Sequence, residues 1–192
     1  MHRIQAAALD LFDERGYPAV TVEEIAEAAD VSPSSVYRYF GAKERLVLWN
    51  DHDPRLIERM AEELTHVPPL EAARRVMVAV MTQVVGEDEA LLRRRVRHVM
   101  ADPTLEAASA ALAYSTSETF GRVLAERVGR QPADLELQVF AHALVGGLLG
   151  CVHHWHGTGF AEPLRDVLAQ CFDLFEAGLR VVAAPIGAGG GA

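Results

Sequence analysis

Apolar residues recur at helical spacing along almost the whole chain, and this periodicity constrains the fold more than any other feature. Ile4, Ala8, Leu11 and Phe12 follow the i, i+4, i+7, i+8 spacing of one buried helix stripe, which should end near Gly16. Alternating runs bounded by hairpin dipeptides, the signal of β-strands, are nearly absent. Half of the residues are hydrophobic, which is enough to form a sizeable core. The sequence therefore predicts an all-α fold.

Residues 1–46 are predicted to form a three-helix N-terminal domain whose last two helices are short. The first of these two begins with Thr21, and Glu24 completes a capping box three positions later. Ser32 caps the second helix, and Pro33 occupies its first position, where a missing N–H does no harm. Two short helices joined by about three residues have the size of a helix-turn-helix, whose second helix enters the DNA major groove.

The second short helix divides its side chains between two faces. Val36 and Phe40 lie four positions apart and are expected to face inward. The face that the core does not need carries polar side chains, namely Ser34, Ser35, Tyr37 and Arg38. The helix N-terminus offers free N–H groups to a phosphate, and Lys43, beyond the turn, could meet a flanking phosphate. This division favours DNA binding.

Two observations leave another interpretation open. Tyr37, Tyr39 and Phe40 could be half-buried aromatic side chains of an ordinary helical corner, because two helices and a turn occur in many proteins. The formal net charge of −9 also argues against a nucleic-acid partner. A helical interaction module that binds no DNA is therefore an alternative.

The segments "AALDLFDERGY", "TVEEIAEAADVS" and "SVYRYFGAKERL" resemble the N-terminal domain of the TetR family of bacterial transcriptional regulators. The resemblance implies an all-helical homodimer that binds double-stranded DNA at a palindromic operator and a small-molecule effector in its C-terminal domain. It implies base contacts by Ser34, Ser35, Tyr37 and Arg38, and phosphate contacts by Thr21, Tyr39 and Lys43. Together with the start of the second helix, the candidate DNA-binding residues are Thr21, Ser32, Pro33, Ser34, Ser35, Tyr37, Arg38, Tyr39 and Lys43.

The remainder of the chain is predicted to form a larger helical domain over residues 47–183. Its longer helices are expected at 70–86, 88–101, 104–130, 133–156 and 162–182, which brings the total to about nine. The glycine-rich residues 184–192 are predicted to form a disordered tail.

The last two helices are predicted to form the dimer interface. The helix at 133–156 is apolar almost all round, and each of Gly146, Gly147 and Gly150 costs about 1 kcal/mol relative to Ala in a helix interior. Close approach of another helix would offset this cost, either across a dimer interface or within one subunit. The candidate interface residues are Leu144, Gly147, Leu148, Cys151, Leu164, Leu168, Cys171 and Phe175.

An effector pocket is expected between the middle helices, although each candidate residue could equally belong to an ordinary core. The methionines suit an adaptable apolar pocket, and the basic run at 93–98 could bind the phosphates of a nucleotide-like ligand, although such runs are usually solvated. The chain is loosely similar to TetR-family members that bind acyl-CoA-like ligands, which implies that ligand class. The candidate residues are Met77, Met81, Arg97, Tyr114, Thr116, Phe120 and Phe140.

Other functional classes find little support in the sequence. Cys151, His153, His154 and His156 include i, i+3 pairs that could ligate a metal, but no second Cys/His cluster follows, so we predict neither a metal nor a cofactor. A Cys/His metal-binding protein stays an alternative. Enzyme motifs such as G-x-S-x-G are absent, so no enzyme is predicted. Two cysteines and the lack of a signal segment favour a cytoplasmic protein without a membrane partner.

Overall fold

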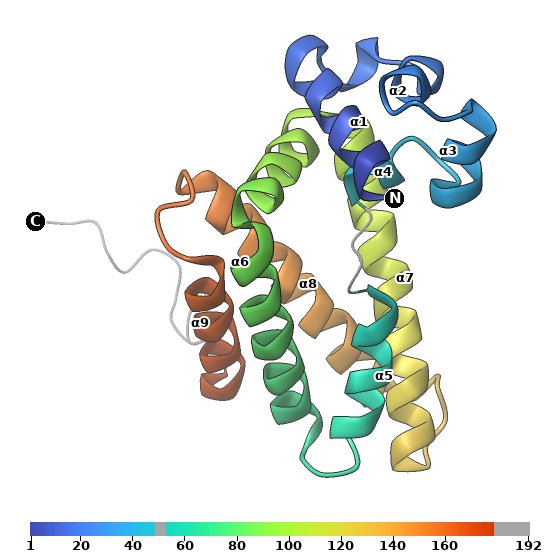
Figure 1. Cartoon of the computed structure of the whole chain (residues 1–192). Coiled ribbons are helices and arrows are strands. Elements are labelled where there is room, and N and C mark those ends of the chain that lie inside the picture. The colour runs from blue at the N-terminus through green and yellow to red at the C-terminus, as the bar shows by residue number, and fades with distance from the viewer. Residues whose placement is uncertain (49–52, 179–192) are drawn as a thin grey trace, which may run out of the picture.

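The computed structural model describes the backbone of residues 1–48 and 53–178. Side chains are described in the same ranges except at residues 53–57 and 80–88. Every regular element in the described ranges is a helix. The all-α prediction is therefore confirmed. The helices of the head are α1 (His2–Arg15), the short 3₁₀ helix η1 (Tyr17–Ala19), α2 (Val22–Ala28), α3 (Pro33–Phe40) and α4 (Arg45–Leu48). The helices of the body are α5 (Asp53–Glu63), α6 (Pro69–Ala101), α7 (Pro103–Val128), α8 (Leu135–Gly157) and α9 (Leu164–Ala177). Figure 1 shows the head at one end of the body, where α6 and α7 reach it.

The prediction of separate helices at 70–86 and 88–101 is wrong, because α6 runs unbroken through both ranges for 33 residues. Gly86 lies inside α6, where an interior glycine costs only about 1 kcal/mol relative to Ala. The predicted helix at 104–130 ends earlier, at Val128, because Gly129 adopts the left-handed conformation with φ 69°. Gly178 ends α9 in the same way, and the predicted tail at 184–192 lies outside the described residues.

The core of the head is formed by the inner faces of α1 to α4. Leu9 and Phe12 of α1 are buried against Ile25 of α2, Phe40 of α3 and Leu46 of α4. Leu11, expected on the buried stripe of α1, is only partly buried, and Leu9 takes the central place instead. The same cluster includes Val99 and Leu105, from α6 and α7, so the head packs directly on the body.

Polar contacts between α1 and α6 also join the head to the body. The Arg94 guanidinium lies 2.6 Å from an oxygen of Asp10 and is paired with Asp13 as well. His98 Nε2 lies 2.7 Å from the other oxygen of Asp13. Because these partners are 81 to 85 residues apart in sequence, they fix the position of the head relative to α6.

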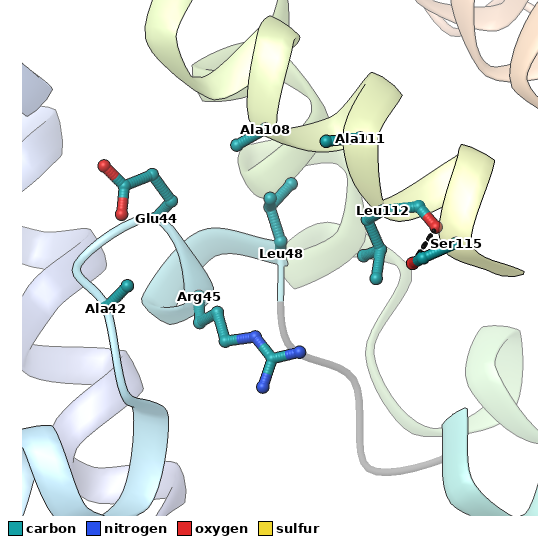
Figure 2. Close-up of a pocket in the computed structure, with 8 residues that line it drawn as sticks. All are labelled: Ala42, Glu44, Arg45, Leu48, Ala108, Ala111, Leu112 and Ser115. Carbon is teal, nitrogen blue, oxygen red and sulfur yellow. Dashed lines mark hydrogen bonds between the residues drawn. The ribbon is translucent and has the colours of Figure 1, made fainter.

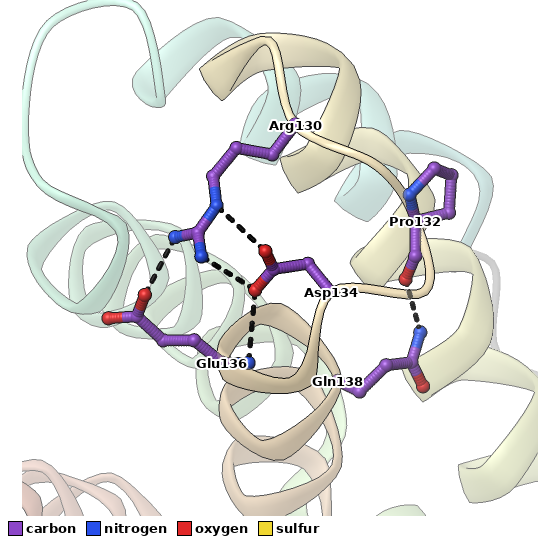
Figure 3. A network of polar contacts seen from close by, with 5 residues as sticks. All are labelled: Arg130, Pro132, Asp134, Glu136 and Gln138. Carbon is purple, nitrogen blue, oxygen red and sulfur yellow. Dashed lines mark hydrogen bonds and ion pairs between the residues drawn. The ribbon is translucent and has the colours of Figure 1, made fainter.

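The turn between α7 and α8 is held by a network around one arginine (Figure 3). Arg130 donates to Asp134 at 2.7 Å and to Glu136 at 2.7 Å. Asp134 also caps α8 by accepting from the Glu136 N–H, and Gln138 Nε2 donates to the Pro132 carbonyl at 2.8 Å. The turn therefore fixes the direction in which α8 enters the body.

The body buries its core between α8 and the helices around it. Trp155 and Phe172 are fully buried there, and the Trp155 indole N–H donates to the Glu162 carbonyl at 2.7 Å. Among the described residues, α8 is the one helix that is long and apolar enough to cross a membrane by length and composition. The core helix of a soluble protein passes the same test, so this finding is weak evidence for a membrane span.

Candidate functional site

Both short helices of the head are capped by the residues that the sequence predicted. The Thr21 hydroxyl accepts from the Glu24 N–H at 3.2 Å, and Glu24 Oε2 accepts from the Thr21 N–H at 2.8 Å. Ser32 Oγ accepts from the Ser35 N–H at 3.2 Å, with Pro33 at the first position of α3. The α2–α3 unit is therefore well defined by local interactions.

The two faces of α3 differ as the sequence predicted. Val36 and Phe40 are each only 2% exposed and attach the helix to the head core. Tyr37 and Tyr39 are 50% and 46% exposed, and Ser34 and Arg38 are exposed as well. Pro33 and Ser35 are partly buried. The outer face thus carries polar and aromatic side chains that the core does not use.

Hydroxyl and guanidinium groups on this face form hydrogen bonds with side chains close by in the sequence. Ser32 Oγ lies 2.9 Å from both the Ser34 and Ser35 hydroxyls, and all three sit at the N-terminus of α3. The Arg38 guanidinium donates to the Tyr39 hydroxyl at 3.3 Å and lies over its ring. Each of these groups can exchange its neighbour for an external hydrogen-bond partner without disturbing the core.

Thr21, a candidate for phosphate contact, is already engaged within the chain. Its hydroxyl lies 2.9 Å from Glu24 Oε2 and donates to that carboxylate. Hydrogen bonds from the Thr21 backbone and from Arg15 lower the pKa of Glu24 to about 2. A phosphate would therefore have to displace a carboxylate from the Thr21 hydroxyl.

Lys43, which was also predicted to contact a phosphate, points toward its own domain. Its Nζ donates to the Tyr17 carbonyl at 2.6 Å and lies 4.0 Å from the centre of the Tyr17 ring. Burial lowers the pKa of the Lys43 ammonium. In this geometry Lys43 ties the turn after α3 to η1, a role that sequence reasoning missed because the two residues are 26 positions apart.

The candidate effector residues do not converge on one site. Phe120 and Phe140 pack together with ring centres 6.0 Å apart, and Met77 packs against the same core cluster. Tyr114 is 62% exposed, and the Thr116 hydroxyl donates to the carbonyl of its own helix at Leu112. Arg97 lies over the Phe160 ring at 5.3 Å, and the Met81 side chain lies outside the described residues.

The candidate dimer residues divide between the core and the surface of the body. Leu144, Leu164 and Leu168 are buried in the core of the single chain, whereas Leu148 and Phe175 are only partly buried. Gly147, Cys151, Cys171 and Phe175 line a cavity of 470 Å³ between α8 and α9. Of these four, Cys151 and Cys171 are each only 8% exposed and belong to the core of the body.

The three glycines of α8 are in different surroundings. A Cβ at Gly147 would lie 2.7 Å from the Phe175 ring. This glycine therefore allows close approach of α9 within the same subunit, which is one of the two explanations that the sequence left open. A Cβ at Gly146 or Gly150 would have no neighbour within 4 Å. Gly146 and Gly150 thus form an open strip on α8, near the 53% exposed Leu174 of α9.

The cysteine and histidine residues of "CVHHWH" do not gather as a metal shell. Within the described residues, no group of three or more His, Cys, Asp or Glu side chains is placed to hold an ion. His153 and His154 are exposed, and His156 packs on Phe160. The Cys151 thiol faces Cys171, and the hydrogen bond between them raises the pKa of Cys151 and lowers that of Cys171.

The family model of bacterial regulatory proteins of the tetR family matches residues 4–48, and the model of the MftR C-terminal domain matches residues 67–180. A Mycobacterium tuberculosis protein named as a mycofactocin biosynthesis transcriptional regulator, MftR, is 27% identical over 93% of this chain and 90% of its own length.

Solved structures share the fold at low sequence identity. The complex of Stenotrophomonas maltophilia SmeT with triclosan has a TM-score of 0.62 and 19% identity, over 92% of this chain and 90% of SmeT. Thermus thermophilus FadR in complex with lauroyl-CoA has a TM-score of 0.52 and 24% identity, over 99% of both chains. These likenesses show a common fold.

Proposed function

Because the chain belongs to the TetR family of bacterial transcriptional regulators, we propose that it is a homodimeric repressor released from a palindromic operator by a small-molecule effector. The observation that carries this proposal is the outer face of α3, where Tyr37 and Arg38 are exposed on a helix anchored by Val36 and Phe40. Such a repressor acts on DNA in the cytoplasm, and we assign it no catalytic role.

In the proposed complex, the N-terminal part of α3 enters the major groove. Base contacts are made by Ser34, Ser35, Tyr37 and Arg38. An arginine can donate two hydrogen bonds, one from each terminal nitrogen, to a single guanine. Ser32 and Pro33 place the free N–H groups of α3 against a phosphate, and Tyr39 holds a phosphate nearby. Thr21 holds another once its hydroxyl turns away from Glu24. We assign Lys43 to bracing the turn rather than to a direct phosphate contact, since its Nζ is bound to Tyr17.

The proposed dimer forms through α8 and α9. The exposed strip of Gly146 and Gly150 lets a second helix approach closely, and Leu174 and Val139 add exposed apolar surface, at 53% and 58%. A long apolar helix with an uncovered face loses free energy in water, so a second copy that covers this face stabilises both. We place the dimer axis there.

The proposed effector is an acyl-CoA or another hydrophobic molecule bound in the body. Support comes from fold neighbours, since FadR was solved with lauroyl-CoA and SmeT with triclosan. In the body, Met77, Phe120 and Phe140 supply the flexible and aromatic side chains that such a molecule would displace or contact. Successive major grooves on one side of DNA lie about 34–36 Å apart, and the two heads must have this spacing to bind both. Effector binding would then favour a different spacing of the heads and so release the DNA.

Fluorescence anisotropy with the duplex that flanks this protein's own gene tests the proposal, at two salt concentrations. We expect saturable binding that weakens as salt rises, because phosphate contacts release counterions. Arg38→Ala should cost about 1–3 kcal/mol of operator binding if it contacts a base. Arg127→Ala is the matched control, since Arg127 is exposed in the last turn of α7, far from α3. Equal losses for both variants would contradict the role of α3.

A further inference from the structure

A separate cavity of 330 Å³ lies where the head meets the body, between α4 and α7 (Figure 2). Leu48 of α4 faces Ala108, Ala111 and Leu112 of α7 across it, so most of its wall is apolar. Ligand pockets in proteins begin at about 300 Å³ and are mostly apolar with a few polar groups that fix orientation. The cavity is therefore large enough for a compact small molecule, and none of the candidate effector residues lines it.

One positive charge faces this cavity without a partner among the described side chains. Arg45 is exposed, lines the cavity and extends into the open space beside Leu48 (Figure 2), and it makes no hydrogen bond or ion pair with any side chain that the structure describes. Glu44 also lines the cavity, but its carboxylate accepts a hydrogen bond from the Tyr17 hydroxyl. Glu44 keeps its negative charge, but its carboxylate points away from the Arg45 guanidinium (Figure 2), so Arg45 is the positive charge that a ligand in this cavity can reach.

We infer that this cavity binds a compact anion with an apolar body. A carboxylate, or a group of similar charge, pairs with the Arg45 guanidinium, and the apolar part lies on Leu48, Ala111 and Leu112. The Ser115 hydroxyl, at the edge, already donates to the Leu112 carbonyl at 2.9 Å and is left to act as an acceptor. Because Ser115 has no free donor for a carboxylate, Arg45 is the group that selects for negative charge.

The location of this site couples it to α3. Ala42 and Glu44, which line the cavity, belong to the turn that directly follows α3. A molecule that contacts this turn and α7 together holds the head in one position relative to the body. Binding itself rests only on the geometry of the cavity, whereas an effect on DNA also rests on the proposed function. The two can therefore fail separately.

Isothermal titration calorimetry with octanoate tests the inference on the full chain without DNA. Octanoate should bind saturably at millimolar concentrations, and Arg45→Gln should weaken this binding tenfold or more, since a charge-assisted hydrogen bond is lost. Arg127→Gln, the same substitution on an exposed arginine of α7, should leave the affinity unchanged. Octan-1-ol, the neutral counterpart, should bind more weakly and without dependence on Arg45.

A second variant fills the cavity from an exposed position of α7. Ala111→Phe places a ring where the apolar part of octanoate would lie, and Ala111 is exposed, so the fold should tolerate the change. We expect Ala111→Phe to abolish octanoate binding. Equal octanoate affinity of the wild type, Arg45→Gln and Ala111→Phe would overturn the inference, as would the lack of any saturable binding. Octanoate binding by a chain that binds no operator would instead refute only the proposed function.

Discussion

Replacement of Gly147 by alanine tests whether the close contact between α8 and α9 within one chain requires a glycine at this position. Alanine in a helix interior is favoured over glycine by about 1 kcal/mol. Against this, the new Cβ would lie 2.7 Å and 2.8 Å from two atoms of the Phe175 ring, closer than real Cβ atoms come to other atoms. Overpacking of this kind typically costs about 1–3 kcal/mol. We therefore expect Gly147→Ala to lower the free energy of unfolding by up to about 2 kcal/mol.

A double-mutant cycle makes this prediction specific. In a Phe175→Ala background the ring is absent, and the nearest remaining atom is Cys171 Sγ at 3.5 Å, an ordinary contact. Gly147→Ala should then stabilise the protein by about 1 kcal/mol, the helix preference of alanine alone. The coupling between the two substitutions should thus amount to about 1–3 kcal/mol.

Denaturant unfolding of the four proteins at one fixed concentration measures this coupling, because the stability of a dimer depends on concentration. Gly157→Ala is the control within the same helix, since a Cβ at that position has no neighbour within 4 Å and Gly157 lies outside the proposed dimer strip. If Gly147→Ala changes stability by the same amount with and without the Phe175 ring, the contact does not explain this glycine.

Three other substitutions test the dimer face, the cap of α2 and the turn after α3. Gly150→Trp should convert the dimer to a monomer in light scattering, because the open strip on α8 would be filled by a bulky ring; an unchanged dimer mass would move the interface elsewhere. Glu24→Gln should lower the melting temperature at pH 7. The pKa of Glu24 is depressed from 4.5 to about 2, so its contribution to stability is fully present above pH 4.5 and is lost as the pH falls toward 2. The difference in melting temperature between the two proteins should therefore shrink over that pH range. Lys43→Ala should lower the melting temperature if Lys43 braces the turn; a normal melting temperature with a salt slope reduced by about 1 would instead indicate a phosphate contact.

The features that the sequence predicted well are those set by near neighbours in the chain. The two faces of α3 follow from its helical period, and its cap follows from Ser32 and Pro33. By contrast, the predicted division of α6 is wrong, because the helix continues through Gly86, whose local cost of about 1 kcal/mol is small beside the packing of a long helix. Local signals are thus reliable where packing agrees with them.

The features that the sequence did not predict depend on residues brought together from far apart. Arg94 belongs to a basic run that could have bound ligand phosphates, yet it pairs with Asp10 and Asp13 of α1. Lys43 fits a phosphate contact by position, and only the fold places the Tyr17 carbonyl 2.6 Å away from it. A charged side chain can serve a structural or a binding role, and the choice depends on which partner the fold supplies.

These long-range contacts hold the head on the body in two different ways. At the α1–α6 joint, Arg94 and His98 meet carboxylates, and Val99 is buried in the head core. At α4 and α7 the same head faces a cavity in which Arg45 has no described partner. The first joint is closed by direct polar contacts, so we infer that any movement of α3 relative to the body pivots there. A molecule in the cavity would oppose rotation toward α7, because its volume would have to be expelled, and would thereby link the occupancy of the cavity to the position of α3.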